Sequence, residues 1–135
     1  MTMVVFSKCS ALVIEDQSFI RGVVVKILKQ LSFGGIMEAE DGTVGLEIAL
    51  DRRPDVIICD IEMAPMDGLT FLRELRKKED DRYAIPVMFL TNHADKDTVL
   101  KARDLGVNAF VAKPVTVAAL REKLTILLQR RLSAV

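Results

Sequence analysis

The sequence has no tryptophan, one tyrosine, one histidine and two cysteines among its 135 residues. It also lacks an excess of either charge, because 19 basic side chains balance 19 acidic ones. Nucleic-acid affinity depends on a basic surface that neutralises phosphates, so this balance argues against direct binding to nucleic acid. No apolar stretch reaches the roughly 18 residues of a membrane span, and the apolar start at residues 3–6 is too short for a signal peptide. We therefore expect a cytoplasmic protein without a nucleic-acid or membrane partner.

The scarcity of cysteine argues against a disulfide. Cys9 opens the first apolar run and Cys59 lies near the end of the third, which places them at opposite ends of parallel strands.

Apolar residues, by contrast, make up 50% of the chain, and a chain of this size can remove roughly two-thirds of its unfolded surface from water. We expect one domain spanning residues 1–135, with its core at about 8–131 and no output domain.

Five apolar runs alternate with helical patterns along the chain. The runs predicted as strands are residues 11–14, 36–39, 56–59, 86–90 and 107–112. Strict alternation implies right-handed crossovers and helices on both faces of a parallel sheet. The sequence therefore predicts an α/β fold with a doubly wound, five-stranded parallel sheet, (βα)5, of flavodoxin-like strand order 2-1-3-4-5.

Several local signals define the predicted helices. The residues expected to cap helix starts are Asp41, Asp67, Asp95 and Thr116. In the first helix, the residues expected on the buried face recur at four-residue steps and are Phe19, Val23, Ile27 and Leu31. Gly34 and Gly35 are expected to end that helix, and the charged run at residues 76–82 is expected to be solvated.

Acidic residues follow two of the predicted strands. Glu15 and Asp16 come after the first strand and Asp60 after the third, and these strands are neighbours at the switch point of the predicted sheet. Unit charges about 4 Å apart interact by roughly 4 kcal/mol at an effective dielectric of 20, so clustered carboxylates need a cation. Mg²⁺ suits such a site, since it prefers oxygen ligands and phosphate. Asp60 could then attack a phosphoryl group and form an acyl phosphate.

Two further residues follow strands on the same edge. Lys113 follows the fifth strand and Thr91 the fourth, so an ammonium and a hydroxyl could reach a phosphoryl group there. Taken singly, a lysine in this place is ordinarily a solvated strand end and a threonine is ordinarily a helix cap. Their joint placement beside the acidic residues favours a role in phosphoryl chemistry.

With these motifs in order, the chain resembles the receiver domain of bacterial two-component response regulators, in a stand-alone, chemotaxis-regulator-like form. The motifs are residues 12–16, residues 60–68, Thr91 after an apolar strand, and Lys113-Pro114. The resemblance implies that Asp60 is the phosphoacceptor and that Glu15, Asp16 and Asp60 hold Mg²⁺ with the backbone carbonyl of Glu62. It also implies that Thr91 and Lys113 contact the phosphoryl oxygens.

The resemblance assigns further roles. Phe110 matches the aromatic switch position that responds with Thr91 to phosphorylation, although the sequence without this resemblance favours a core residue. The Lys113-Pro114 bond matches a cis peptide. Glu62 and His93 match positions that tune the lifetime of the phosphorylated state, and each could equally be an exposed loop residue.

The leading functional hypothesis is a phosphorylation-activated signalling switch. Its implied partners are a histidine kinase or histidine phosphotransfer protein and a downstream protein target, and it would not be an enzyme beyond its own dephosphorylation. One alternative is a magnesium-dependent phosphohydrolase with an aspartyl nucleophile, against which Glu62 stands where such enzymes place a second aspartate. The other alternative is an adaptor that works without phosphorylation.

Overall fold

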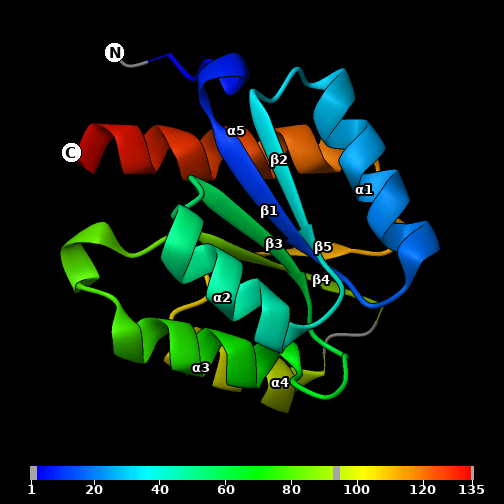
Figure 1. Cartoon of the computed structure of the whole chain (residues 1–135), viewed down its shortest axis with the longest axis vertical. Coiled ribbons are helices and arrows are strands. Elements are labelled where there is room, and N and C mark those ends of the chain that lie inside the picture. Colours follow the sequence, from blue (N-terminus) through cyan, green and yellow to red (C-terminus); the bar gives the residue numbers. More distant parts are fainter. Residues whose placement is uncertain (1–2, 93–94, 135) are drawn as a thin grey trace.

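The protein folds around a parallel sheet, as seen in a computed structural model that describes residues 3–92 and 95–134. The strands of the described residues are β1 (Ser10–Ile14), β2 (Gly35–Ala39), β3 (Val56–Asp60), β4 (Val87–Thr91) and β5 (Ala109–Ala112). They form one sheet in the order β2-β1-β3-β4-β5, and every neighbouring pair is parallel (Figure 1). The predicted α/β fold and strand order are confirmed. The fifth strand is shorter than predicted because residues 107–108 lie in the connection between α4 and the strand.

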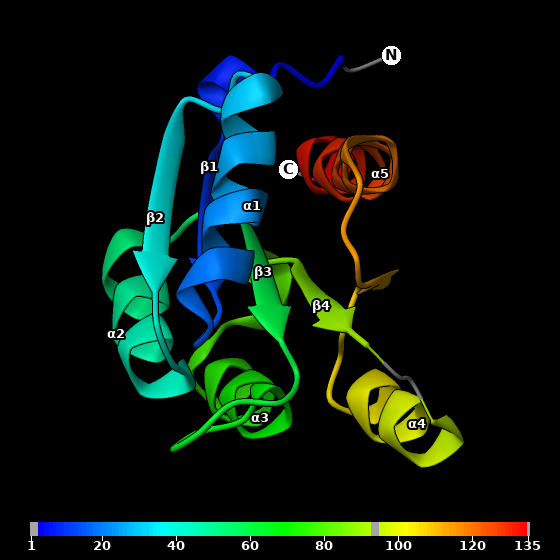
Figure 2. The same ribbon diagram turned by 90° about the vertical axis from the view of Figure 1, so that its right-hand side faces the viewer.

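Helices cover both faces of the sheet. The described helices are α1 (Ser18–Gln30), α2 (Gly42–Arg52), α3 (Gly68–Lys78), α4 (Lys96–Asp104) and α5 (Val117–Ala134), with short 3-10 turns η1 (Phe6–Lys8) and η2 (Asp81–Tyr83). Helices α1 and α5 pack on one face, and α2, α3 and α4 pack on the other (Figure 2). The sheet is thus the middle of three layers.

Side chains of the central strand alternate between the two cores. All of β3 is buried, with Ile58 in the core under α1 and α5, and Ile57 and Cys59 in the core under α2 and α3. A strand covered on both faces needs apolar residues at every position, which explains its continuous apolar run. Asp60 ends this run, and burying a carboxylate there requires charged partners.

The predicted helix caps are confirmed. The Asp67 carboxylate accepts from Thr70 N at 2.8 Å, and the Thr116 hydroxyl accepts from Ala119 N at 3.1 Å. Asp41 and Asp95 cap α2 and α4 in the same way. Such caps satisfy backbone donors at helix starts and place those starts in the chain.

The prediction for the buried face of α1 is wrong for two of its four residues. Phe19 is 82% exposed and Val23 is 36% exposed, whereas Val24 and Leu28 are fully buried. Successive residues of a helix turn by about 100°, so four-residue steps drift around the axis by roughly 40° each. The drift carries Phe19 out of the core and leaves an aromatic ring in solvent.

The end of α1 also differs from the prediction. The helix ends at Gln30 and Ser32 adopts a positive φ of 67°, so the chain turns before the glycine pair. Gly34 has another role, because a Cβ there would collide with the backbone carbonyl of Ser7. It allows the N-terminal segment to pack closely against the turn after α1.

The charged run at residues 76–82 is not simply solvated, which corrects the prediction. The side chain of Glu79 is 1% exposed and that of Arg76 is 18% exposed, and the two form an ion pair at 2.7 Å. Sequence alone could not show this, because the oxygens that accept hydrogen bonds from Arg76 belong also to loops outside the run.

Both cysteines are free and buried, as expected for core residues. None of the helices in the described part of the chain combines the length and hydropathy needed to cross a membrane.

Candidate functional site

Four strands deliver polar side chains to one edge of the sheet. Glu15 directly follows β1, Asp60 ends β3, Thr91 ends β4 and Lys113 directly follows β5. Because all of these strands are parallel, their carboxyl ends meet at the same edge, where open α/β sheets bind ligands. The structure therefore brings together the residues that the sequence predicted to act together.

Three carboxylates form a cluster at this edge. One oxygen from each of Glu15, Asp16 and Asp60 lies within 4.8 Å of the others. Glu15 is fully buried and Asp60 is 6% exposed, while Asp16 is exposed to solvent. The cluster thus has a buried base and one side open to solvent. A site that binds a phosphoryl group needs such an opening.

Lys113 reaches into the cluster. Its Nζ lies 3.0 Å from Glu15 Oε1 and 3.3 Å from Asp60 Oδ1, and its side chain is 8% exposed. Burial alone would lower the pKa of Lys113, but the hydrogen bond to Glu15 and the charge of Asp60 outweigh burial and raise this pKa. Lys113 is therefore a fixed positive charge beside Asp60, and the alternative of a solvated strand end is excluded.

Glu15 has an unsatisfied oxygen. Its Oε2 is buried and has no hydrogen-bond partner among the described residues. Burial, followed by the hydrogen bond with Asp60, raises the pKa of Glu15 to about 7, although Lys113 opposes the rise. A divalent cation would satisfy this oxygen and the carboxylate charges together. The all-oxygen donor set of Glu15, Asp16 and Asp60 fits Mg²⁺ in particular.

Two residues to which the sequence analysis gave no role in the site support it. Arg21 of α1 donates through Nη1 to the backbone carbonyl of Glu15 at 2.7 Å and holds the end of β1 in place. Gly68 passes so close to β3 that a Cβ there would lie 2.5 Å from the backbone oxygen of Asp60. The Asp67-Gly68 pair was a visible signal for a helix start, but no local signal pointed to Arg21.

The predicted switch residues lie on neighbouring strands. Phe110 is partly buried against the core under α2, α3 and α4, and its ring centroid lies 6.1 Å from that of Phe89. Thr91 is half-buried, and its backbone oxygen accepts from Lys113 N at 2.9 Å. Phe110 therefore has a packed position that a change at Thr91 could disturb.

The loops around the site carry the remaining predicted features. The Lys113-Pro114 peptide is cis, as predicted, and Ala64-Pro65 is a second cis peptide that the sequence did not indicate. Glu62 is exposed in the loop after β3. His93 lies outside the described residues.

An apolar pocket adjoins the acidic cluster. Its volume is about 310 Å³, and its lining residues are Phe19, Ile20, Val23, Asn92, Lys113, Pro114 and Val115. The pocket lies between α1 and the loop after β5, with Lys113 shared between it and the acidic cluster. A molecule that approaches Asp60 from this side meets the exposed ring of Phe19.

A doubly wound sheet that gathers two acidic strand ends, a threonine and a lysine at one edge defines a receiver domain. The family described as response regulator receiver domain matches residues 11–125, and the chain belongs to this family. Among similar proteins are chemotaxis protein CheY-3 of Vibrio cholerae, at 32% identity over 88% of this chain and 91% of its own length. Chemotaxis protein CheY of Pseudomonas aeruginosa is 33% identical over 88% of this chain and 95% of its own length.

Solved structures agree with this assignment. Vibrio cholerae chemotaxis protein CheY4 superposes with a TM-score of 0.82 at 26% identity, covering 89% of this chain and 98% of its own. The chain is thus a receiver domain of the CheY-like response regulators. Receiver domains are phosphorylation-activated signalling switches and are generally not enzymes. Receiver domains bind Mg²⁺ in an acidic pocket and interact with histidine kinases and downstream targets.

Proposed function

We propose that Asp60 accepts a phosphoryl group from a phosphorylated histidine of a kinase or phosphotransfer protein. A carboxylate oxygen of Asp60 attacks phosphorus, the phosphorus–nitrogen bond breaks, and the imidazole leaves with the bond's electrons and takes up a proton. The observation that carries the proposal is the position of Asp60, buried beside Glu15 and 3.3 Å from Lys113 Nζ. This position gives the carboxylate both an acidic metal site and a cation for the phosphoryl oxygens.

The surrounding residues would bind either the metal ion or the oxygens of the phosphoryl group. Glu15 and Asp16, with Asp60 and the backbone carbonyl of Glu62, would hold Mg²⁺, which supplies positive charge that offsets the charge on the transferred group. Lys113 would pair with a phosphoryl oxygen in place of the Asp60 oxygen that it now contacts. Thr91 would donate its hydroxyl to another phosphoryl oxygen.

We test this proposal by labelling with acetyl phosphate in the presence and absence of Mg²⁺, with intact-mass detection. The parent protein should gain the mass of one phosphoryl group only with Mg²⁺, and Asp60→Asn should gain none. Asp67→Asn is the matched control, because Asp67 is an exposed carboxylate in the same loop that caps α3. Equal labelling of Asp60→Asn and the parent would refute Asp60 as the acceptor.

The phosphorylated state would be read on the face formed by α4, β5 and α5. Phosphorylation adds charge and acceptor oxygens next to Thr91, and movement of Thr91 would leave space for the Phe110 ring to turn inward. A partner that binds equally well with and without beryllofluoride, a phosphoryl mimic, would instead favour an adaptor independent of phosphorylation.

The lifetime of the acyl phosphate would depend on Glu62 and His93. Glu62 is exposed two residues beyond Asp60, so its carboxylate can flank the path of attacking water. We propose that the protein catalyses its own dephosphorylation to an extent set by these two side chains. Glu62→Ala and His93→Ala should change the half-life of the labelled protein, and unchanged half-lives in both variants would remove this role.

A further inference from the structure

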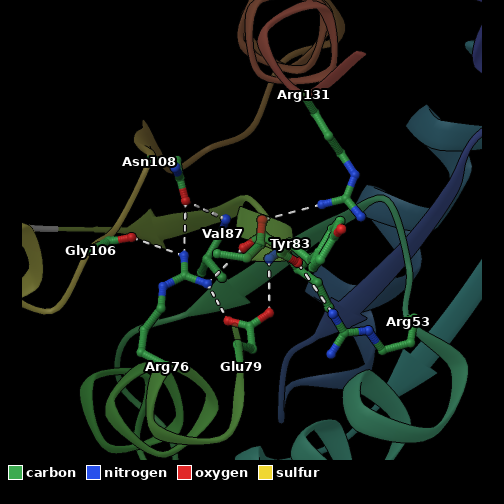
Figure 3. A network of polar contacts seen from close by, with 10 residues as sticks. Arg53, Arg76, Glu79, Tyr83, Val87, Gly106, Asn108 and Arg131 are labelled. Carbon is green, nitrogen blue, oxygen red and sulfur yellow. Dashed lines mark hydrogen bonds and ion pairs between the residues drawn. The ribbon is translucent and has the colours of Figure 1, made fainter. Parts of the chain in front are cut away.

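Arg76, in the last turn of α3, connects three separate parts of the chain. Its Nη1 donates to Glu79 Oε1 at 2.7 Å and to the backbone oxygen of Ile85 at 2.9 Å. Its Nη2 donates to the backbone oxygen of Gly106 at 2.9 Å and to Asn108 Oδ1 at 3.1 Å (Figure 3). One guanidinium thus joins the end of α3, the loop before β4 and the turn between α4 and β5.

The partners of Arg76 are themselves bound. Glu79 Oε2 accepts from Ile85 N at 2.8 Å, and Asn108 Oδ1 accepts from Val87 N at 2.8 Å. The Glu79 carboxylate is almost completely buried, so its charge depends on Arg76 for compensation. The fork of Arg76 can serve several acceptors at once because its donors have a fixed planar arrangement.

Two more arginines hold the loop before β4. Arg53 Nη2 donates to the backbone oxygen of Tyr83 at 3.2 Å, and Arg131 Nη1 donates to that of Ala84 at 3.3 Å (Figure 3). With Arg76 at Ile85, three successive carbonyls are each bound by an arginine from a different part of the fold. Arg53 has a φ of 48°, a backbone conformation that favours glycine. Placing an arginine there costs conformational energy, and the arginine side chain supplies the hydrogen bond to Tyr83.

The Arg76 contacts lie at the far ends of the elements that carry the switch residues. Strand β4 starts at Val87 and ends at Thr91, beside the acidic cluster. Strand β5 starts immediately after Asn108 and carries Phe110, and α4 ends two residues before Gly106. Arg76 therefore ties together one end of each element, while the opposite ends of β4 and α4 face the phosphorylation side.

Core packing alone holds α4 weakly. Ala102 is the one buried residue of α4, and the exposed side chains include Leu100 at 46%. A helix with a single small residue in the core has an orientation that depends on its end contacts. The Arg76 bond to Gly106 is such a contact, made at the C-terminal end of α4.

We propose that Arg76 is a positioning residue of the switch and acts as the pivot for α4. It holds the far ends of β4, α4 and β5 together, so that a change at Thr91 turns α4 about a fixed end. Without this tie, the turn at residues 106–108 would absorb the change and α4 would respond less. The inference rests on the proposed phosphorylation of Asp60 and concerns how that event reaches the surface.

The test measures hydrogen exchange of α4, residues 96–104, with and without Mg²⁺ and beryllofluoride. Loading should change exchange in α4 of the parent protein, and in Arg76→Met this change should fall to about half or less at equal loading. Arg76→Lys should restore part of the response, because an ammonium can still reach one or two of the carbonyls. Lys78→Met removes an exposed basic side chain from the same last turn of α3; it is the matched control and should respond like the parent.

A second variant keeps the test decisive if Arg76→Met does not fold. Asn108→Ala leaves Arg76 and Glu79 paired but removes the link from Arg76 to Val87, and it should also reduce the α4 response. If a variant that folds and binds beryllofluoride shows the same change in α4 exchange as the parent, the pivot role of Arg76 is refuted, while the proposed phosphorylation of Asp60 is not affected. Failure of the parent to load beryllofluoride would overturn the proposed function, and with it the pivot.

Discussion

Glu15 is the side chain whose protonation the fold alters most clearly within the neutral range. Burial and the hydrogen bond with Asp60 raise its pKa from 4.5 to about 7. Between these two values the folded protein holds a proton that the unfolded chain has lost, so the free energy of unfolding must fall as pH rises through this window. Lys113 does not add to this slope, because its pKa is raised above 10.5.

We therefore expect metal-free protein to lose roughly 3 kcal/mol of stability between pH 4.5 and pH 7 through Glu15. Urea denaturation in the presence of EDTA measures this loss. In Glu15→Gln the slope should be shallower by that amount, because the amide does not titrate. Parallel stability curves for the two proteins would show that Glu15 is ionised at both ends of the window.

The start of α3 and the middle of α1 each contain a glycine, and replacing each by alanine should change the free energy of unfolding in opposite directions. A Cβ at Gly68 would lie 2.5 Å from Asp60 O and 2.8 Å from Ile61 Cα, both backbone atoms that cannot yield cheaply. A Cβ at Gly22 would meet nothing within 4 Å. The first glycine is required by its close approach to β3 at Asp60, and the second is not required by any contact that a Cβ would make.

Gly22→Ala should raise the free energy of unfolding by about 0.5–1 kcal/mol, because alanine is the better helix former at an exposed position. Gly68→Ala should lower it by about 1–3 kcal/mol and should also slow labelling of Asp60, because β3 must shift. Chemical denaturation and acetyl phosphate labelling of the two variants give both readouts. A Gly68→Ala protein as stable and as reactive as the parent would contradict the close approach.

Helix α1 presents Phe19 beside the path to Asp60. Its ring is 82% exposed and lines the apolar pocket that also contains Lys113, so a protein that delivers a phosphoryl group there can pack against it. Phe19→Ala should slow transfer from a phosphorylated histidine kinase that labels the parent by about tenfold, as loss of an aromatic anchor does. Labelling by acetyl phosphate should be unchanged, since that donor needs no docking surface. An equal loss with both donors would place the defect in the site rather than in docking.

The whole domain should gain stability from the metal. Its acidic cluster forms only when β1 and β3 are paired, so the unfolded chain has no comparable site. Mg²⁺ at about 100 times its dissociation constant should then raise the free energy of unfolding by about 2.7 kcal/mol. Asp16→Asn should lose most of this gain, and Asp51→Asn, an exposed acid on α2, should keep it. A gain that survives in Asp16→Asn and Asp60→Asn would place the bound ion elsewhere.

Much of the architecture could be predicted because its causes are local. Apolar runs, glycines and capping residues such as Asp67 act within a few positions of the chain, and they located the strands and most helix starts. The meeting of polar residues at one edge of the sheet could be predicted for a related reason. Glu15, Asp60, Thr91 and Lys113 each follow or end an apolar run, and parallel strands must bring such ends together.

The errors arose where a residue's surroundings come from distant parts of the chain. Phe19 fits an apolar pattern of four-residue steps, yet the face that α1 turns to the sheet decides which of these positions are buried, and it leaves the ring of Phe19 exposed. Arg76 and Glu79 belong to a charged run, yet the two residues are buried by partners outside it: Ile85 in the loop before β4, and Gly106 and Asn108 about 30 residues along the chain. The pairing of Lys113 with Glu15 joins residues 98 positions apart and could be inferred only as proximity.

The residue order of this chain was therefore sufficient for its class, its strand order and the meeting of Glu15 and Asp60 at one edge of the sheet, because those depend on short-range patterning and on the geometry of parallel strands. The folded structure was needed to show which charges are buried, why burial raises the pKa of Glu15, and that Arg76 links α3 to the loop before β4 and the turn before β5. Burial and electrostatic coupling are properties of neighbours in space, and neighbours in space are assembled only when the sheet and its helices pack.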